Sequence, residues 1–273
     1  MEFDRAKEIL ELNRQVYSEV EKKYKMDLYE SDDMLDIQFI ESALKADENV
    51  HLLNLPIKND RVGAVACTIG LKHFILLNTN ISRGERNYHL AHDYYHIKHE
   101  HSNEVKTLIC EIRDKSGDLA VDYSDPHKNK TEKMASLYAS MILLPEKYIR
   151  KSYDLVCKYH PNDLNARVCE IMNSKMVPFT LVVIRLRELE LIDEDEFREL
   201  LLVNHTVLVN TFDKYGINKA CIELADESNY QMLEERLVEV ATKKPGEISD
   251  YSLNEIVKII SLTFDIDLGD DNE

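Results

Sequence analysis

The feature that most limits how this chain can fold is a change of hydrophobic period, from helical to strand-like and back. Residues 3–25 repeat apolar side chains every three or four positions, which predicts a long amphipathic helix, and Met34–Leu44 predicts a second. From His51 to Asn80 the apolar runs become short and rich in Val and Ile, as in a small antiparallel sheet. After Ser82-Arg83-Gly84 helical spacing returns through roughly Lys98, and it returns again over Glu132–Leu144. We therefore expect an α+β fold.

The composition is that of a globular protein and excludes several classes of function. The 273 residues are 44% hydrophobic and carry a formal net charge of −17, which argues against a broad basic surface for nucleic acid or anionic lipid. The five cysteines never form a Cys-x-x-Cys pair, so no thiolate zinc site is expected. Neither a secretory signal nor a stretch long enough to cross a bilayer is found. We expect a cytoplasmic protein without a membrane or direct nucleic-acid partner.

The second half of the chain is expected to contain a helix pair and an acidic region. Leu164–Met172 and Phe179–Leu189 have the outline of a helix-turn-helix, but acids accompany their few bases, so packing on the preceding residues is expected instead of DNA binding. Residues 191–273 carry 7 basic and 20 acidic side chains, which places −13 of the net charge there. This small α/β region is predicted to hold two strands and two helices, over Val207–Asn210, Ala220–Leu224, Gln231–Ala241 and Ser252–Leu262.

Half of the histidines cluster in one short stretch, most of them on a predicted helix. Five of the ten fall within thirteen residues, namely His89, His92, His96, His99 and His101. On a helix His92 and His96 differ by about 40° in direction and about 6 Å along the axis, so both imidazoles can reach one metal ion. With Asp93 beside them, His-Asp-Tyr-Tyr-His is the zincin arrangement His-Glu-x-x-His with a shorter acid. Such a pair also occurs by chance on solvated helix faces, so a third ligand is needed.

Glu132 is the candidate for that third ligand. A catalytic zinc site generally has three protein ligands and one open position. Glu132 shares a helical stripe with the core-facing Ala135 and Ala139, where an unpaired carboxylate would be costly and metal ligation would offset the cost. The alternative is that Glu132 stands in the first turn of its helix, after Thr131, and complements the helix dipole. The spacing alone does not distinguish a metal ligand from a residue that interacts with the helix dipole.

Two segments together resemble the ImmA/IrrE family of metallopeptidases. The first is Arg86-Asn-Tyr-His-Leu-Ala-His-Asp-Tyr-Tyr-His96, where the family shows Arg-x-Phe-Thr-Leu-Ala-His-Glu-x-Gly-His. The second is Glu132-Lys-Met-Ala-Ser-Leu-Tyr-Ala-Ser-Met-Ile-Leu-Leu-Pro145, where the family shows Glu-x-x-Ala-Asn-x-Phe-Ala-x-x-Leu-Leu-Met-Pro. Residues 177–192 are similar to the stretch that follows in the family. The resemblance therefore covers roughly residues 1–192.

The resemblance implies a minimal zincin-like metallopeptidase domain, in which His92, His96 and Glu132 bind Zn2+. We expect this domain over residues 1–150 and a helical, helix-turn-helix-like segment over 151–192. Because the composition shifts near Asp193, residues 193–273 are expected to form a separate acidic region. That region could dock the basic DNA-reading surface of a partner, or it could be only a solvated surface.

Members of the family typically cleave or release a helix-turn-helix repressor. The resemblance therefore implies a zinc-dependent endopeptidase that derepresses phage, mobile-element or stress genes. Asp93 stands where the family has its general-base Glu, and Tyr95 stands where it has Gly and would crowd the cleft. If Asp93 reaches the attacking water, it acts as the general base. If it does not, the chain is a zinc-containing protein that sequesters a repressor or toxin without proteolysis.

Overall fold

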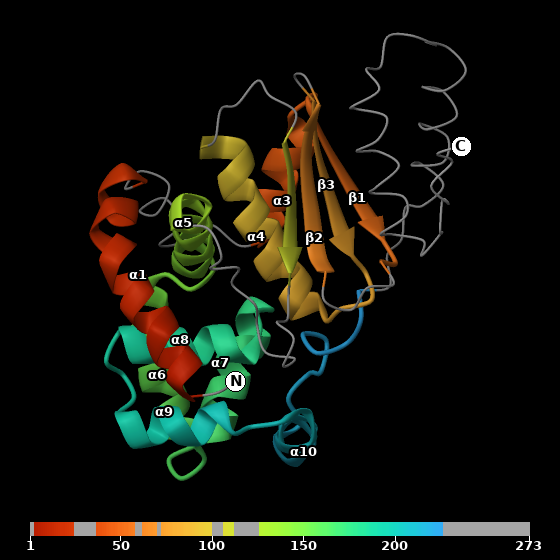
Figure 1. Cartoon of the computed structure of the whole chain (residues 1–273). Coiled ribbons are helices and arrows are strands. Elements are labelled where there is room, and N and C mark those ends of the chain that lie inside the picture. Colours follow the sequence, from red (N-terminus) through yellow and green to blue (C-terminus); the bar gives the residue numbers. More distant parts are fainter. Residues whose placement is uncertain are drawn as a thin grey trace, which may run out of the picture.

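The structure is a computed structural model that describes residues 3–24, 37–57, 62–69, 72–99, 106–111 and 126–225 (Figure 1). In chain order the described elements are α1 (Phe3–Lys23), α3 (Ile37–Ala46), β1 (Val50–Leu55), β2 (Val62–Ile69), β3 (Lys72–Asn78), α4 (Arg83–His99), β4 (Lys106–Glu111), α5 (Pro126–Leu143), α6 (Glu146–Tyr159), α7 (Leu164–Lys175), α8 (Phe179–Glu188), α9 (Glu194–Leu201) and α10 (His205–Tyr215). The predicted helices Gln231–Ala241 and Ser252–Leu262, and His101, lie outside the described residues. The α+β class is confirmed.

Four strands form one mixed sheet in the order β1-β3-β2-β4. Strand β2 pairs antiparallel with β3 and β4, whereas β1 pairs parallel with β3, so that Val50 lies opposite His73. The prediction of a purely antiparallel sheet is therefore wrong for β1. Hydrophobic alternation indicates which residues form strands but not which strand becomes the neighbour of which, because that choice depends on packing across the whole sheet.

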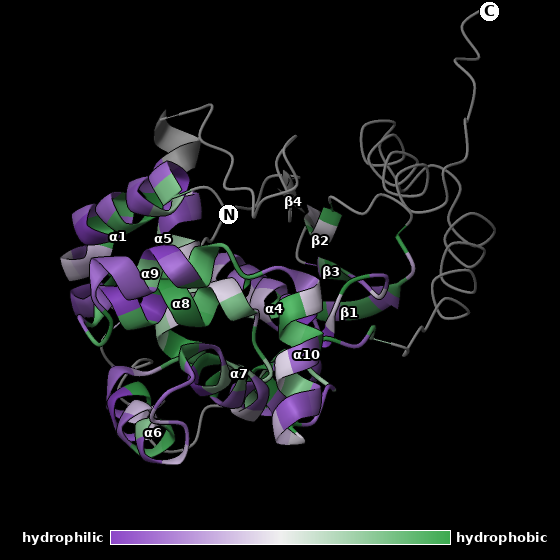
Figure 2. Cartoon of the chain, turned by 90° about the horizontal axis from the view of Figure 1, so that it is seen from below, coloured by the Kyte–Doolittle hydropathy of each residue, from purple (hydrophilic) through white to green (hydrophobic). Residues whose placement is uncertain are grey.

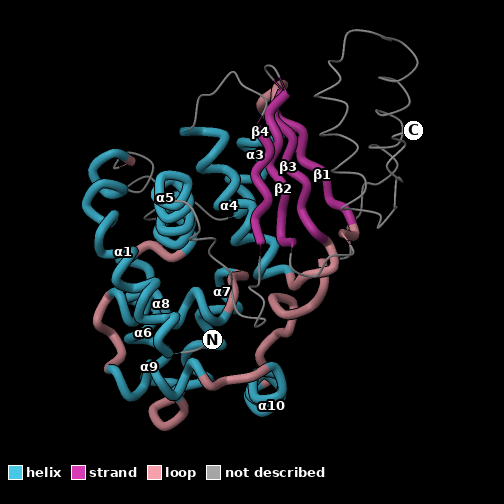
Figure 3. The backbone as a smooth tube through the Cα atoms, viewed as in Figure 1, coloured by secondary structure: helices cyan, strands magenta, loops and turns pink. Residues whose placement is uncertain are grey.

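The two faces of the sheet are both apolar, and the described helices cover one of them. Helices α3 and α4 lie on the same side of the sheet (Figures 1 and 3). The strand residues on that side belong to the main core and include Val50, Leu52, Ala64, Ile75 and Leu77. The alternate residues form a second cluster that includes Leu53, Leu55, Val65, Phe74 and Leu76, which we call the outer face.

Helix α5 lies beside α4, on the side away from the sheet, and α1 packs against α5, whereas α6 to α10 lie below the sheet (Figure 1). Most of these helices carry both hydrophilic and hydrophobic residues (Figure 2). Arg185 of α8 is 1% exposed and donates to the backbone carbonyl of Leu144 at 3.1 Å and to Glu188 at 3.0 Å. Asn13 of α1 donates to the other oxygen of Glu188. Because a buried guanidinium is tolerated only when it is paired, this network fixes α8 against α1 and the end of α5.

The turn between α7 and α8 packs against the start of α4. A Cβ at Gly84 would lie 2.9 Å from the backbone carbon of Val177, so only glycine allows this approach. Asn87 donates its side-chain amide to the carbonyl of Met176 at 2.9 Å. The expectation that this helix pair packs on the preceding residues is confirmed. In the described part of the chain, no helix is both long enough and apolar enough to cross a membrane.

The described part of the acidic region continues the same helical packing. Phe197 and Leu200 of α9 are each 1% exposed and belong to the main core. Lys7 of α1 pairs with Glu194 at 2.9 Å. On α10, Lys214 contacts Asp163, the residue that caps α7, at 2.8 Å. Residues 194–215 therefore rest on helices that precede them in the chain.

Both strands predicted in this region are wrong. Val207–Asn210 lies inside α10, where the side chain of Asn204 caps the helix by accepting from Val207 N at 3.0 Å. This cap and the burial of Phe212 outweigh the strand preference of the β-branched residues. Ala220–Leu224 is a turn that contributes one isolated bridge, between Leu224 and Ser82.

Candidate metal centre

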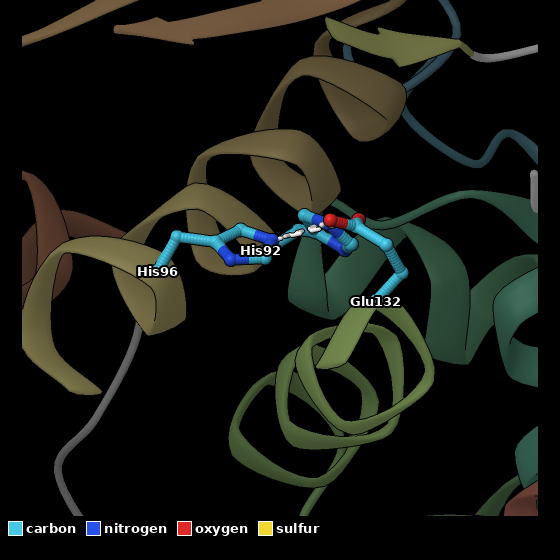
Figure 4. A group of neighbouring side chains, drawn as sticks. All are labelled: His92, His96 and Glu132. Carbon is cyan, nitrogen blue, oxygen red and sulfur yellow. Dashed lines mark hydrogen bonds and ion pairs between the residues drawn. The ribbon is translucent and has the colours of Figure 1, made fainter. Parts of the chain in front are cut away.

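His92 and His96 lie one turn apart on α4, which is almost entirely buried. They are 5% and 4% exposed, and their imidazoles point toward α5, which packs along α4 (Figure 4). Arg86, one of the residues on the family pattern, anchors the first half of this helix. Its guanidinium donates to Asn54 of β1 at 3.0 Å and to Glu41 of α3 at 3.3 Å. Helix α4 is thereby fixed between the sheet and α5.

Glu132 faces the two imidazoles from α5 (Figure 4). This helix begins at Pro126, six residues earlier than predicted, so Glu132 lies in its second turn. The alternative in which Glu132 complements the dipole of the first turn is therefore wrong, because that interaction is confined to the helix end. The side chain is 19% exposed and contacts His92 and His96.

The three ligand atoms are spaced as they would be around one metal ion. The separations are 3.1 Å from His92 Nε2 to Glu132 Oε2, 3.1 Å between the two Nε2 atoms and 3.5 Å from His96 Nε2 to Glu132 Oε2. Ligands bound to zinc at about 2.0–2.1 Å in a tetrahedral arrangement lie about 3.3 Å apart. Two imidazoles and a carboxylate also suit zinc better than magnesium or calcium. The residues present therefore fit a zinc ion.

The electrostatics of the site favour a charged Glu132. Burial by itself raises the pKa of this carboxyl, but hydrogen bonds from His92 and His96, together with their charges, outweigh burial and hold its pKa well below the usual value. Since a carboxylate binds metal only when it is ionised, Glu132 is ready to act as a ligand at neutral pH.

Ser136 orients His92 by contacting the ring nitrogen that does not face Glu132. This serine was not predicted from the sequence. Its Oγ lies 3.3 Å from His92 Nδ1, the ring nitrogen turned away from Glu132. A ligand histidine usually donates its second N–H to such a partner, which fixes the tautomer and the ring orientation. Ser136 follows Glu132 by four residues, so the helical spacing that selected Glu132 could also have selected this serine.

Asp93 is fully buried, at 0% exposure, and is not part of the group formed by the three ligand atoms. The structure brings together the three predicted ligands, and Asp93 directly follows the first of them on α4. Asp93 follows His92 on α4, so its side chain leaves the helix about 100° away from that of His92. A shorter acid at this position has less reach toward the site than the glutamate of the family pattern.

His89 lies on α4 three residues before His92, yet it is no ligand. It is 3% exposed, and neither ring nitrogen has a hydrogen-bond partner among the described residues. Burial, with a smaller effect from His92, lowers the pKa of His89 to about 3, so the ring is neutral at physiological pH. The centre therefore holds no additional positive charge from this histidine.

His99 and the tyrosines around it form an aromatic cluster. Tyr95 and Tyr138 are 2% and 0% exposed, and the ring centroid of His99 lies 5.3 Å from each. Tyr24 completes the cluster, with its hydroxyl 2.9 Å from that of Tyr95. The tyrosine that replaces the family glycine is thus a core residue that joins α1 to α4, as expected for aromatic side chains at helical spacing.

Comparisons of this chain with protein-family models, curated proteins and solved structures find no match. The relation to the ImmA/IrrE family therefore stays a prediction from two short segments, and the geometry of His92, His96 and Glu132 stands independently of it.

Proposed function

We propose that this chain is a zinc-dependent endopeptidase that cleaves or releases a helix-turn-helix repressor, and so derepresses phage, mobile-element or stress genes. The observation that carries the proposal is the convergence of His92, His96 and Glu132 from two packed helices, with ligand atoms 3.1–3.5 Å apart. Three protein ligands leave one position for a reactant, which is typical of catalytic zinc sites and not of structural ones. The repressor as target is supported by the family resemblance alone.

A zinc ion in this site would polarise a peptide carbonyl and make water nucleophilic near neutral pH. The chain itself contributes orientation and a dry environment. Ser136 fixes the ring of His92, and burial of both histidines excludes bulk water from their side of the site. The proton released during hydrolysis needs an acceptor, and Asp93 is the acidic residue that the family pattern assigns to this task.

The decisive experiment combines metal analysis with cleavage. The purified chain should contain about one zinc, and it should cut the helix-turn-helix protein encoded beside it into fragments that a chelator prevents. Glu132→Gln keeps the shape of the side chain but removes its charge, so zinc and fragments should both be lost. His205→Ala, an exposed histidine on α10, serves as the control and should retain both. Fragments that persist in Glu132→Gln would contradict the proposal.

A second candidate is a zinc-containing protein that sequesters a repressor or toxin without proteolysis. The observation that favours it is Asp93, which is shorter than the glutamate of the family pattern and is 0% exposed. In this case the partner leaves its DNA in the presence of the chain, but no fragments form. Gel-shift and mass-spectrometric measurements on the same mixture separate the two candidates.

Substitutions at Asp93 provide the matching prediction. For a peptidase, Asp93→Asn should retain zinc and lower the cleavage rate by about 10²–10⁴, because the amide cannot accept a proton. Asp93→Glu should preserve or raise the rate, since it extends the acid by about 1.5 Å. Equal release of the partner from DNA by the wild type and both variants, without fragments, would rule out the peptidase.

A further inference from the structure

The start of α4, which carries two of the candidate ligands, is held by residues 217–225. This segment rises from α10 to reach α4 (Figure 1). Arg83 N donates to Glu223 O at 2.9 Å, and Gly84 N donates to Cys221 O, also at 2.9 Å. The first N–H groups of a helix have no acceptor inside the helix, so residues 217–225 supply partners that α4 itself cannot.

The turn between α7 and α8 contacts the same point of α4. A Cβ on Gly84 would lie 2.9 Å from Val177 C and 3.1 Å from Cys221 O, so this turn and residues 217–225 meet at one glycine. About one turn further along α4, Asn87 donates to Met176 O at 2.9 Å. The turn therefore fixes α4 both at its start and one turn inside it.

The same pair of helices also holds α5, which carries Glu132. Arg185 of α8 donates to the carbonyl of Leu144, the residue directly after the end of α5, at 3.1 Å. Helices α7 and α8 and residues 217–225, which we call the bridging unit, therefore contact both helices from which the three candidate ligands come.

We infer that the bridging unit sets the position of α4 relative to α5 and thereby the geometry of the metal centre. Carbon atoms in contact are best separated by about 3.5–4.0 Å, so a methyl group on Gly84 would require a movement of about half an ångström or more. Distances from a metal ion to its ligands vary by only about 0.2 Å. His92 lies eight residues after Gly84, about 12 Å along the same helix, so α4 carries the movement to the ligands.

The inference rests on the metal centre of the proposed function but not on the cleavage of any protein, so the two can fail separately. Arg83, Gly84 and their partners are positioning residues, since they lie outside the group of ligand atoms. A purely structural role would change stability alone, whereas a positioning role changes the arrangement of the ligands. Cobalt(II) in place of zinc reports that arrangement, because its visible absorption depends on the number and geometry of the ligands.

Gly84→Ala in the full chain is the first test. The methyl group favours α4 itself, because alanine has the higher helix propensity, but it forces α4 and the bridging unit apart. The cobalt absorption should change, and the affinity for cobalt should fall by about 2–30-fold, as for substitutions that act on a site from a distance.

Ile149→Val, in the core beside α6 and outside the bridging unit, controls for a general loss of stability. It should lower the melting temperature and leave the cobalt absorption as in the wild type. An unchanged absorption and affinity in Gly84→Ala would overturn the inference. An equal change of absorption in Ile149→Val would do so too, and so would a wild type without cobalt absorption bands.

Arg83 offers a second, independent pair of variants. It is the first residue of α4, where proline is compatible with a helix. Arg83→Pro and Arg83→Ala both lose the side chain, but only proline also removes the N–H that donates to Glu223 O. The proline variant should bind cobalt about 2–30-fold more weakly than the alanine variant. If Gly84→Ala does not fold, this pair decides, and equal affinities and absorption in the two variants would overturn the inference.

Discussion

At the scale of single residues, the contact between Ser136 Oγ and His92 Nδ1 allows a test of the centre that leaves all three ligands in place. Ser136→Ala should weaken zinc binding by about tenfold, because residues that orient a ligand histidine typically contribute 10–100-fold to metal affinity. Competition with a chromophoric chelator measures the change. Ser140→Ala is the matched control, since Ser140 lies one turn further along α5 and its Oγ has no hydrogen-bond partner among the described residues. Unchanged affinity in Ser136→Ala would contradict an orienting role.

The three candidate ligands could be predicted at this scale because each belongs to a short sequence pattern. His92 and His96 have the i, i+4 spacing, and Glu132 is an acid on an apolar stripe. The burial of His89 and of Asp93 could not be predicted, because it depends on what packs on the remaining sides of α4. Periodicity identifies a buried face, but a helix buried all round has no single face to identify.

At the scale of elements, Asp163 links α7 to α10. Its carboxylate accepts from Ala166 N at 3.1 Å as the N-cap of α7, and from Lys214 and Tyr215 of α10 at 2.8 Å each. Asp163→Ala should lower the free energy of unfolding by about 1 kcal/mol, the usual contribution of an N-cap. Asp163→Asn keeps a capping oxygen and loses only the charge, so its effect should be well below 1 kcal/mol for such a solvent-accessible pair.

The pH dependence of this link has a definite sign. Burial raises the pKa of Asp163, but the hydrogen bonds from Lys214, Ala166 and Tyr215 outweigh it, so the folded pKa lies below the unfolded one. The stabilisation is therefore present above the unfolded pKa, about 3.9, and is lost as the pH falls through the folded value. Urea unfolding from about pH 6 to about pH 3 should show the wild type converging on Asp163→Asn. Asp154→Asn, at an exposed position on α6, should show no such convergence.

Most helices and strands were predictable where one hydrophobic period dominated a segment. The wrong and missing predictions each have a cause in the local sequence. Helix α4 was predicted almost to its ends, because glycine and serine precede a long helical run. For α10 the β-branched Val207 and Val209 predict a strand, whereas the cap by Asn204 favours the helix that forms. Helix α6 was missed, although it starts directly after Pro145, where a new helix can begin.

At the scale of the whole molecule, the centre joins two helices whose ligands lie 36 or more residues apart in the chain. His92 and His96 come from α4 and Glu132 from α5, so metal binding should stabilise the folded state as a whole. Zinc at about 100 times its dissociation constant contributes about 2.7 kcal/mol, which corresponds to a melting temperature about 5–10 °C higher. Calorimetry with and without chelator measures this shift. His92→Ala should melt at one temperature in both conditions, and a chelator effect that persists in this variant would contradict the assignment.

The parallel pairing of β1 with β3 also has a consequence for the order in which the sheet forms. Strands β2 and β3 are neighbours in the chain and form a local hairpin, whereas β1 can join only after β3 offers its free edge. Leu53→Ala should therefore mainly accelerate unfolding, whereas Val65→Ala should slow folding, as stopped-flow kinetics can measure. Because β1 covers the edge of β3 at Phe74-Ile-Leu-Leu77, detachment of β1 would expose a run able to pair with other chains. Pairing with β1 therefore protects the edge of β3 from aggregation with other chains.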